Sequence, residues 1–383
     1  MEKNQLNGVK FEFGFPTKIF FGGGRLDDCG KIVSEFNPKK ILLVTSNGSM
    51  KRLGYVDRLV ESVSRSTKAG IAVFDGISGE PSLETCDAVA AFAGKEKAEI
   101  VMGLGGGSVL DTAKAAAMLA ANRGNAADYA EKKGFAKKGV PFIAIPGTSG
   151  SGSEVTRASV FKDSTRHEKI VIRSDNSFPA AAIVDPLITL SCPPKVTAES
   201  GMDVLTHAVE AFVSSAASPV TDAFAFKAAM LVNSSLETAF ADGKNVRARH
   251  DMSLASLLSG MAISNAGTGA CHAFAHSIGG KFGVSHGRIN AVMLPHVMKL
   301  NLSARREKFG ILAKAFGKNS AEEAIQRVKA LAQGVGITET LRDFGITNAD
   351  FSSIADGCFR GTIKRNPKEV SKPDLLGVLE KAL

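Results

Sequence analysis

Apolar residues in the first half of the chain gather in short continuous runs instead of alternating with polar ones. Such runs are typical of strands that are covered on both faces. We expect strands at 17–22, 39–46, 71–77, 99–105, 140–147, 158–162, 169–174 and 181–185. Stretches with helical periodicity lie between several of them, at 51–67, 83–97 and 108–121. Strands that alternate with helices predict a parallel sheet with helices on both faces.

The pattern changes after residue 185, where DPLITLSCPPKVTAES (185–200) contains three prolines. Almost no strand pattern follows, and we expect helices near 197–215, 221–240, 246–265, 271–281, 287–302, 305–316, 320–336 and 371–383. A chain of 383 residues is also longer than one hydrophobic core usually serves. We therefore predict a Rossmann-like α/β domain over 1–186 and an all-helical domain over 187–383.

Composition excludes several classes of protein. The net charge is +9, but its densest cationic segment, 130–139, contains only Phe135 as an aromatic residue. Nucleic-acid binding would favour interleaved aromatics, so we interpret this segment as a solvated loop.

The five cysteines are widely spaced without a CxxC motif, which favours free thiols in a reducing compartment. No apolar run approaches the ~20 residues of a membrane helix, and we see no signal peptide, so we expect a cytoplasmic protein.

Two glycine-rich turns follow predicted strands of the sheet. In EIVMGLGGGSVLDTAKAAAMLAA (99–121), a strand leads through glycines into a helix that Ser108 opens. Glycines allow close approach of a phosphate, and the N-terminus of a helix favours its charge. The GxGxxG fingerprint is not met, because Ser108 replaces the last glycine. Asp111, in the first turns of the helix, is a candidate acceptor for a ribose or amide, or else a surface carboxylate.

The second turn, IPGTSGSGSEVT (145–156), adds the hydroxyls of Thr148, Ser149 and Ser151. Ligands bind at the carboxyl ends of parallel strands, so both turns predict a cradle for a pyrophosphate or ribose. The second strand ends in VTSNGSMKR (44–52). An acidic residue there would bind the ribose 2′-hydroxyl of NAD, but Ser46 is neutral and two cations follow, which leaves room for NADP.

Histidines are concentrated in CHAFAHSIGGKFGVSHG (271–287), which contains His272, His276 and His286. An earlier helical segment, GMDVLTHAVEAF (201–212), places Asp203 and His207 four residues apart on one helical face. Each pair alone is more often a buried structural pair than a metal site. Together, three imidazoles and one carboxylate would suit Zn²⁺ or Fe²⁺.

The combination of these motifs resembles the iron-containing (group III) alcohol dehydrogenases over essentially the whole chain. The matching pieces are FPTKIFFGGG, GLGGGSVLDTAKA, IPGTSGSGSEVT, AIVDPLITLSCPPKVTAESGMDVLTHAVEAFVS, CHAFAHSIGGKFGVSHGRINAVMLPHV and NPKEVSKPDLLGVLEKAL. The resemblance implies a dinucleotide-binding first domain and a second, metal-binding domain. It also implies a homodimer, as well as Fe²⁺ or another divalent metal such as Zn²⁺.

Residue roles follow from the same resemblance. It implies that Asp203, His207, His272 and His286 hold the metal, and that His276 faces the substrate, to relay a proton or to position the hydroxyl. It implies cofactor contacts from Gly105, Gly106, Gly107, Ser108, Asp111, Thr148 and Ser151, and from Lys169 near the nicotinamide ribose. Ser149 and Ser46 join this candidate set from their positions in the loops. Members that prefer NAD often have Asp at the position of Ser46, which supports NADP or the use of both cofactors.

The expected function is hydride transfer between NAD(P)(H) and a small alcohol or aldehyde. The alternatives are a glycerol-dehydrogenase-like enzyme or a dehydroquinate-synthase-like lyase on the same scaffold. The lyase would require basic clusters around an anionic substrate, and the segment near His286 supplies only Lys281 and Arg288. A metallohydrolase would not need the two glycine-rich turns. A protein that only binds a ligand would not need the four candidate metal ligands.

Overall fold

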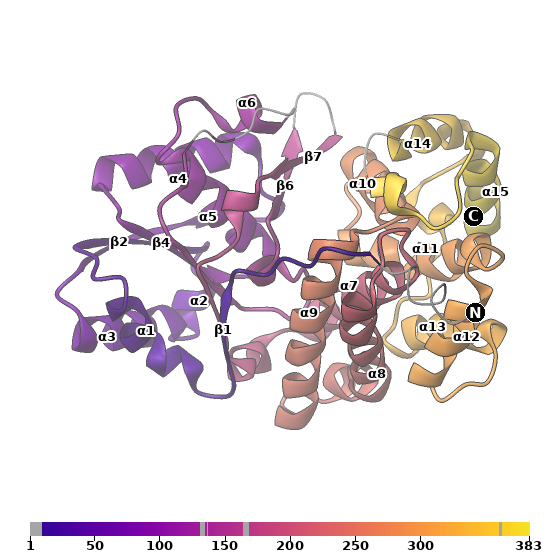
Figure 1. The fold of residues 1–383 in the computed structure, drawn as a ribbon, viewed down its shortest axis with the longest axis horizontal. Helices are drawn as coiled ribbons and strands as arrows, with labels where there is room; N and C mark the ends of the chain where they lie inside the picture. Colours follow the sequence, from indigo (N-terminus) through magenta and orange to yellow (C-terminus); the bar gives the residue numbers. More distant parts are fainter. Residues whose placement is uncertain (1–9, 131–134, 136, 164–167, 360–361) are drawn as a thin grey trace, which may run out of the picture.

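The α/β half and the helical half of the protein lie side by side (Figure 1). The computed structural model describes residues 10–130, 135, 137–163, 168–359 and 362–383. A six-stranded sheet has the order β1-β8-β5-β4-β2-β3, and every neighbouring pair is parallel. Its strands are β1 (Lys18–Phe21), β2 (Lys40–Ser46), β3 (Gly70–Ile77), β4 (Ile100–Gly105), β5 (Phe142–Pro146) and β8 (Ala181–Val184). The predicted parallel sheet is confirmed.

Both faces of the sheet are covered by helices, as the continuous apolar runs predict. Ile41 and Leu43 of β2 pack on one face with α1 and α3, whereas Leu42 and Val44 pack on the other with α4 and α5. Successive side chains of a strand point to opposite faces, so both sets must be apolar. The helices of this half are α1 (Cys29–Ser34), α2 (Ser49–Arg52), α3 (Tyr55–Ser66), α4 (Leu83–Glu96), α5 (Gly107–Leu119) and α6 (Ala126–Ala130).

The helix predicted over 51–67 is interrupted. Gly54 adopts the left-handed conformation, with φ of 77°, between α2 and α3. Glycine takes this conformation at little cost, so the chain turns there and the predicted single helix is wrong.

A separate antiparallel hairpin joins β6 (Ala158–Asp163) to β7 (Glu168–Arg173). On one face of the hairpin, Phe161 and Ile172 belong to a buried cluster with residues of α4, α5 and α6. On the other face, Lys169 and Arg173 share the alternate positions of β7. β7 packs beside α10 of the helical half (Figure 1), so this second face meets the helical half of the molecule.

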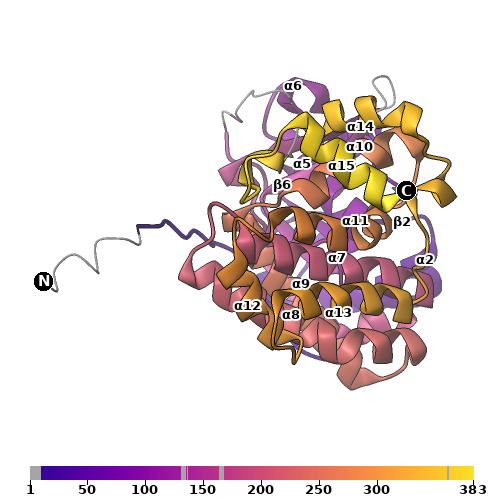
Figure 2. The same cartoon turned by 90° about the vertical axis from the view of Figure 1, so that its right-hand side faces the viewer.

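Helices form the second half, and one large apolar cluster joins them. They are α7 (Pro194–Val213), α8 (Pro219–Ala241), α9 (Val246–Ala266), α10 (Ala270–Phe282), α11 (His286–Asn301), α12 (Arg306–Ala315), α13 (Ala321–Gly334), α14 (Phe351–Cys358) and α15 (Lys372–Ala382). Figure 2 shows this half facing the viewer, with α7 behind α12 and α13. Helix α14 was not predicted, nor were the short helices α1 and α6.

Short 3-10 turns connect these elements: η1 (Arg25–Asp28), η2 (Ser153–Val155), η3 (Asp175–Ser177), η4 (Pro186–Ser191), η5 (Leu341–Phe344), η6 (Asn348–Asp350) and η7 (Thr362–Arg365). Among the described helices, none has the length and apolar character needed to cross a membrane. All five cysteines are free, in agreement with the prediction. Most of the cationic segment 130–139 lies outside the described residues.

Candidate active site

The two glycine turns meet at the carboxyl ends of β4 and β5. The Gly147 N–H donates to the Gly105 carbonyl oxygen over 2.7 Å. A β-carbon on Gly107 would lie only 2.8 Å from Oγ of Ser151. The absence of a side chain at Gly107 is therefore what lets the two turns touch.

Helix α5 begins at this junction without a side-chain cap. Gly106 occupies the N-cap position and makes no side-chain hydrogen bond, and Ser108 lies in the first turn. Unpaired N–H groups and the positive end of the helix dipole favour an anion at such a terminus. The hydroxyls of Ser149 and Ser253 of α9 share a hydrogen bond of 2.9 Å. The second turn is thereby fixed to the helical half.

The carboxylate of Asp111 is less available to a ligand than the sequence predicts. One of its carboxylate oxygens accepts from the Val160 N–H over 2.9 Å, and the other accepts from the Ser153 hydroxyl. The fully buried ammonium of Lys114 lies 3.6 Å from Asp111 and donates to Ser153 over 2.7 Å and to the Ala158 carbonyl over 2.8 Å. Asp111 therefore braces the hairpin against α5 and is not a free surface carboxylate.

The loop after β2 holds the candidate determinant of cofactor choice. The hydroxyls of Ser46 and Ser49 share a hydrogen bond. Gly48 between them is left-handed, and a β-carbon there would lie 2.7 Å from Nη1 of Arg52. The guanidinium of Arg52 thus folds back over Gly48, in the loop that follows the neutral Ser46.

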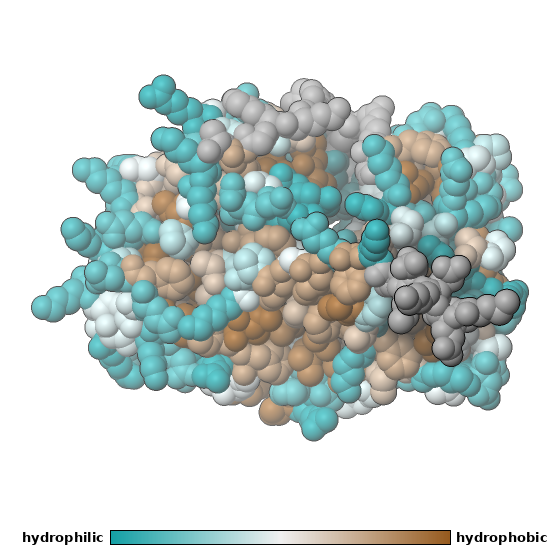
Figure 3. Space-filling view, in the orientation of Figure 1, coloured by the Kyte–Doolittle hydropathy of each residue, from teal (hydrophilic) through white to brown (hydrophobic). Residues whose placement is uncertain are grey.

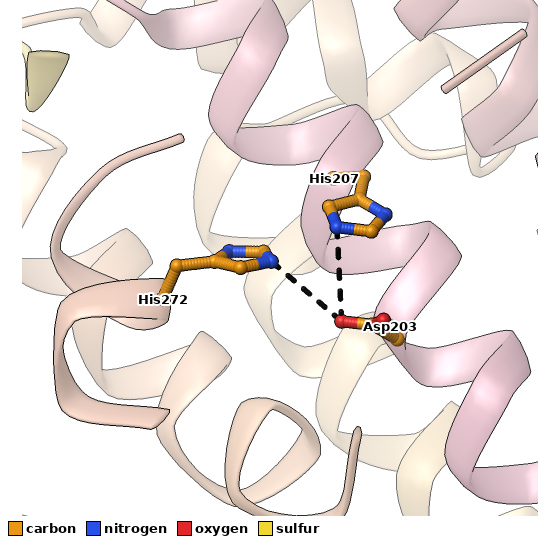
Figure 4. A group of neighbouring side chains, drawn as sticks. All are labelled: Asp203, His207 and His272. Atoms are coloured by element: carbon orange, nitrogen blue, oxygen red, sulfur yellow. Dashed lines mark ion pairs between the residues drawn. The ribbon is translucent and has the colours of Figure 1, made fainter. Parts of the chain in front are cut away.

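The metal-ligand candidates converge from three helices. Helix α7 carries Asp203 and His207 one turn apart, α10 carries His272 (Figure 4), and α11 begins with His286. Oδ1 of Asp203 lies 3.9 Å from Nε2 of His207, 3.6 Å from Nε2 of His272 and 3.7 Å from Nε2 of His286. The ligand atoms of Asp203, His207 and His272 all lie within 4.8 Å of one another, while His286 approaches this group from the side of Asp203.

These spacings fit the coordination shell of one ion. Donor atoms placed tetrahedrally at about 2.0–2.2 Å from a metal lie roughly 3.4 Å apart. Nε2 of His272 is buried and has no hydrogen-bond partner, although it points toward Asp203. An unpaired nitrogen among buried carboxylate and imidazole groups is costly unless a cation binds it. The residues therefore fit a divalent metal.

A second layer of polar residues orients these side chains. Nδ1 of His272 lies 2.6 Å from Oε2 of Glu210, and the Asn290 amide donates to Oδ1 of Asp203 over 2.7 Å. Hydrogen bonds of this type fix the tautomer and the angle of metal-binding side chains. Although burial opposes it, the carboxylate of Glu210 raises the pKa of His272.

The remaining imidazoles stay neutral. Burial lowers the pKa of His207 to about 4, and it holds the pKa of His286 well below its usual range, with Lys169 adding to the effect. Neutral imidazole is the form that binds a metal. Asp203 supplies the negative charge among these candidate ligands.

His276 lies beside the cluster. Its ring centroid lies 6.4 Å from that of His272 and 5.3 Å from that of His286. Burial, followed by the positive charges of Lys169, His272 and Arg173, lowers the pKa of His276 to about 3. Its imidazole is therefore neutral at physiological pH.

Lys169 reaches this region from β7. Its ammonium forms an ion pair of 2.7 Å with Glu80, and a β-carbon on Gly279 of α10 would lie 3.4 Å from its Nζ. Lys169 thus lies against the helix that carries His272 and His276.

A cleft of about 200 Å³ joins the two candidate sites. It is lined by Thr148, Gly150, Ser151, Val196, Glu199, Ser200, Asp203, Ser285, His286 and Gly287. The second glycine turn therefore faces two candidate metal ligands across one open space. A group bound to this turn would lie next to these candidate metal ligands.

Glu210 and Asn290 were not predicted from the sequence. Helical spacing offers a signal for both: Glu210 follows His207 by three residues, and Asn290 follows His286 by four. Each polar residue sits one turn from a candidate ligand in an otherwise apolar helix. That position indicates a partner of the site.

A family model described as iron-containing alcohol dehydrogenase matches residues 16–186, and one for the C-terminal part of the same family matches residues 197–383. The chain belongs to the iron-containing alcohol dehydrogenase family. The expected family and enzyme class are confirmed.

Several relatives of this alcohol dehydrogenase cover it almost completely. The 1,3-propanediol dehydrogenase of Klebsiella pneumoniae is 37% identical, over 97% of this chain and 98% of its own. The NAD-dependent methanol dehydrogenase of Bacillus methanolicus is 32% identical, over 97% and 99%. Among solved structures, an alcohol dehydrogenase from Oenococcus oeni has a TM-score of 0.93 at 32% identity, covering 98% of this chain and 100% of its own.

Proposed function

We propose that this alcohol dehydrogenase transfers hydride between NADP(H) or NAD(H) and a small alcohol or aldehyde, with Fe²⁺ or a similar divalent ion. The single observation that carries this proposal is the shared cleft, which Ser151 of the glycine turn and Asp203 and His286 of the candidate metal site all line. One space could thus hold a nicotinamide ring next to the residues that would hold the ion. Direct hydride transfer requires that proximity.

Asp203, His207, His272 and His286 hold the ion in this proposal. A divalent ion supplies Lewis acidity, which polarises the oxygen of the substrate. Glu210 orients His272, and Asn290 orients Asp203. His276 lies next to His286, a position from which it can relay the proton of the alcohol or position the hydroxyl.

The cofactor lies along the edge of the sheet in this proposal. Its phosphates bind at the N-terminus of α5, against Gly105, Gly106, Gly107 and Ser108, with Thr148, Ser149 and Ser151 from the second turn. Lys169 approaches the nicotinamide ribose. Asp111 acts through the hairpin it braces. The neutral Ser46 and the guanidinium of Arg52 support a preference for NADP.

We further propose a division into domains at residues 1–186 and 187–383, supported by the end of β8 at Val184 and the start of α7 at Pro194. A homodimer is supported by the apolar residues that Figure 3 shows across the lower centre of the molecule, over β1 and α9. A cytoplasmic location is supported by the five free cysteines.

The decisive experiment follows NADPH oxidation with a series of short aldehydes. The protein is prepared without metal and then loaded with Fe²⁺ or Zn²⁺. We expect turnover only with metal present, together with bound metal close to one ion per chain. Turnover that is unchanged in fully metal-free protein would contradict the proposed function.

A further inference from the structure

The helical wall of the cleft carries a serine hydroxyl without a partner. Ser285 occupies the N-cap of α11, directly before the candidate ligand His286, and it lines the cleft. An N-cap serine usually accepts a hydrogen bond from the first turn of its helix. Ser285 makes no such bond, and its buried Oγ has no hydrogen-bond partner among the described residues. A buried hydroxyl left unpaired is costly, so this position favours a ligand that supplies the missing hydrogen bond.

A carboxylate lies on the same wall of the cleft. Glu199 of α7 lines it together with Ser285, and its buried Oε1 accepts no hydrogen bond from the described residues. The ion-pair partner of Glu199 is Arg288, whose Nε lies 3.5 Å from this oxygen without the geometry of a hydrogen bond. Nη1 of Arg288 lies 3.0 Å from Glu339, which is not among the residues that line the cleft. Arg288 therefore balances the charge of Glu199 but leaves Oε1 able to accept a hydrogen bond.

Helices α7 and α11 are in direct contact at this point. A β-carbon on Gly287 would lie 2.1 Å from the carbonyl oxygen of Glu199, so the two backbones touch there. Glu199 precedes Asp203 by one turn of α7, and Ser285 directly precedes His286 on α11. The carboxylate and the hydroxyl therefore lie on adjoining helices, each next to a candidate metal ligand.

A carboxylate acceptor beside a hydroxyl donor complements a primary amide, which offers N–H groups and a carbonyl oxygen. Nicotinamide carries its carboxamide on C3, the carbon next to the C4 that exchanges hydride. A ring whose C4 lies near the ion therefore brings its carboxamide close to the metal ligands. We propose that Ser285 donates to the carboxamide oxygen of the cofactor and that Glu199 accepts from its N–H. This inference rests on the proposed function and adds two positioning residues to the same site.

Calorimetric titration of metal-free protein with NADPH measures these contacts without turnover. We expect Ser285→Ala to raise the dissociation constant for NADPH about 5-fold and Glu199→Ala about 10-fold, because one neutral and one charged hydrogen bond are lost. The 3-acetylpyridine analogue of NADPH carries a methyl group in place of the amide NH2. Glu199→Ala should therefore change the dissociation constant of the analogue by less than about two-fold, whereas Ser285→Ala should still raise it.

Two matched variants separate this role from a structural one. Ser320→Ala removes an N-cap serine that does accept from its own helix, so it should lower the temperature of unfolding without changing NADPH binding. Ser285→Ala should leave that temperature unchanged, because its hydroxyl caps no N–H group. Glu339→Ala removes the other partner of Arg288 and should leave the dissociation constant for NADPH within about two-fold.

Three results would overturn the proposed contacts. Equal losses of affinity for NADPH and for the analogue in Glu199→Ala would assign the carboxylate to another part of the cofactor, such as a ribose. Unchanged NADPH binding in both cleft variants, with a lower kcat/KM for aldehydes, would assign this wall to the substrate. Failure of the unmodified protein to bind NADPH or NADH is the third. If the metal-loaded enzyme binds NADPH but reduces no aldehyde, the proposed function fails, and the titrations still decide the carboxamide contacts.

Discussion

Nδ1 of His272 and Oε2 of Glu210 lie 2.6 Å apart, and both side chains are almost completely buried. The carboxylate of Glu210 accepts the Nδ1 proton, which leaves the lone pair of Nε2 directed at Asp203. Oε1 of Glu210 also accepts the Cys271 N–H over 2.7 Å, so Glu210 fixes the backbone of α10 as well as the ring. One carboxylate on α7 thus positions a candidate ligand on α10.

Replacement of His272 by alanine should remove bound metal and lower kcat by at least about 100-fold, because the site loses one of its four candidate ligands. Metal analysis of the purified variant, beside the aldehyde assay, measures both effects. His250→Ala, a change at a partly exposed histidine on α9, is the matched control and should retain metal. Full metal content and activity in His272→Ala would show that the ligand assignment is wrong.

Glu210→Gln keeps the size of the side chain but removes its charge. We expect the dissociation constant for the metal to rise by about 10- to 100-fold, as is typical when a carboxylate partner of a ligating histidine is lost. Competition with a chelator measures the constant, and circular dichroism checks that the fold is intact. Glu237→Gln, which changes an exposed partner of Arg327, is the control. An unchanged constant in Glu210→Gln would argue against an orienting role.

Ser46→Asp should shift cofactor preference toward NAD. A carboxylate at the end of β2 accepts from the ribose 2′-hydroxyl and repels a 2′-phosphate. We expect the ratio of kcat/KM for NADPH to that for NADH to fall by roughly 10-fold or more. Ser66→Asp at the end of α3 controls for added charge. A ratio that does not move would place the selective contacts elsewhere.

Gly287→Ala tests how tightly α11 packs on α7. A β-carbon there would lie 2.1 Å from the carbonyl oxygen of Glu199, so the backbone next to His286 must shift. Forced repacking costs about 1–3 kcal/mol, and we expect both the free energy of unfolding and the metal affinity to fall. Gly310→Ala in α12 meets nothing within 4 Å and should be neutral or stabilising. Equal urea unfolding curves for the two variants would contradict this account.

His296 on α11 predicts a pH dependence of stability. Burial, with Lys299, Lys329 and Lys381, lowers its pKa from 6.5 to about 4. Between these pH values the unfolded chain binds a proton that the folded protein does not, so stability falls as the pH decreases from 6.5 toward 4. His296→Gln should reduce that loss by on the order of 1 kcal/mol at pH 5. Urea unfolding of both proteins at pH 7.5 and pH 5 measures this loss of unfolding free energy. An equal loss in His296→Gln and in the unmodified protein would contradict the prediction.

The strands and the long helices could be predicted because their signals are local. The apolar run of β2 and the glycine turn into α5 each follow from neighbouring residues. The break at Gly54 is local too, but glycine alone does not distinguish a helix interruption from a tolerated interior position.

The candidate site was predicted less completely, because its second layer depends on contacts between helices. Asp203 and His207 share a helical face, which spacing reveals. The contact of Glu210 with His272 joins residues 62 positions apart, which periodicity cannot indicate. Asp111 shows the opposite case: its position near the start of α5 suggested a ligand contact, whereas its oxygens accept from Val160 and Ser153.

The fully buried ammonium of Lys114 has a consequence for communication within the enzyme. It holds Ser153 and the Ala158 carbonyl from the same helix whose first turn faces the glycine junction. Any motion that separated the helix from the hairpin would leave the ammonium of Lys114 buried without its hydrogen-bond partners, which is energetically costly. Helix α5 and the hairpin are therefore held together as one rigid unit, without a hinge between them.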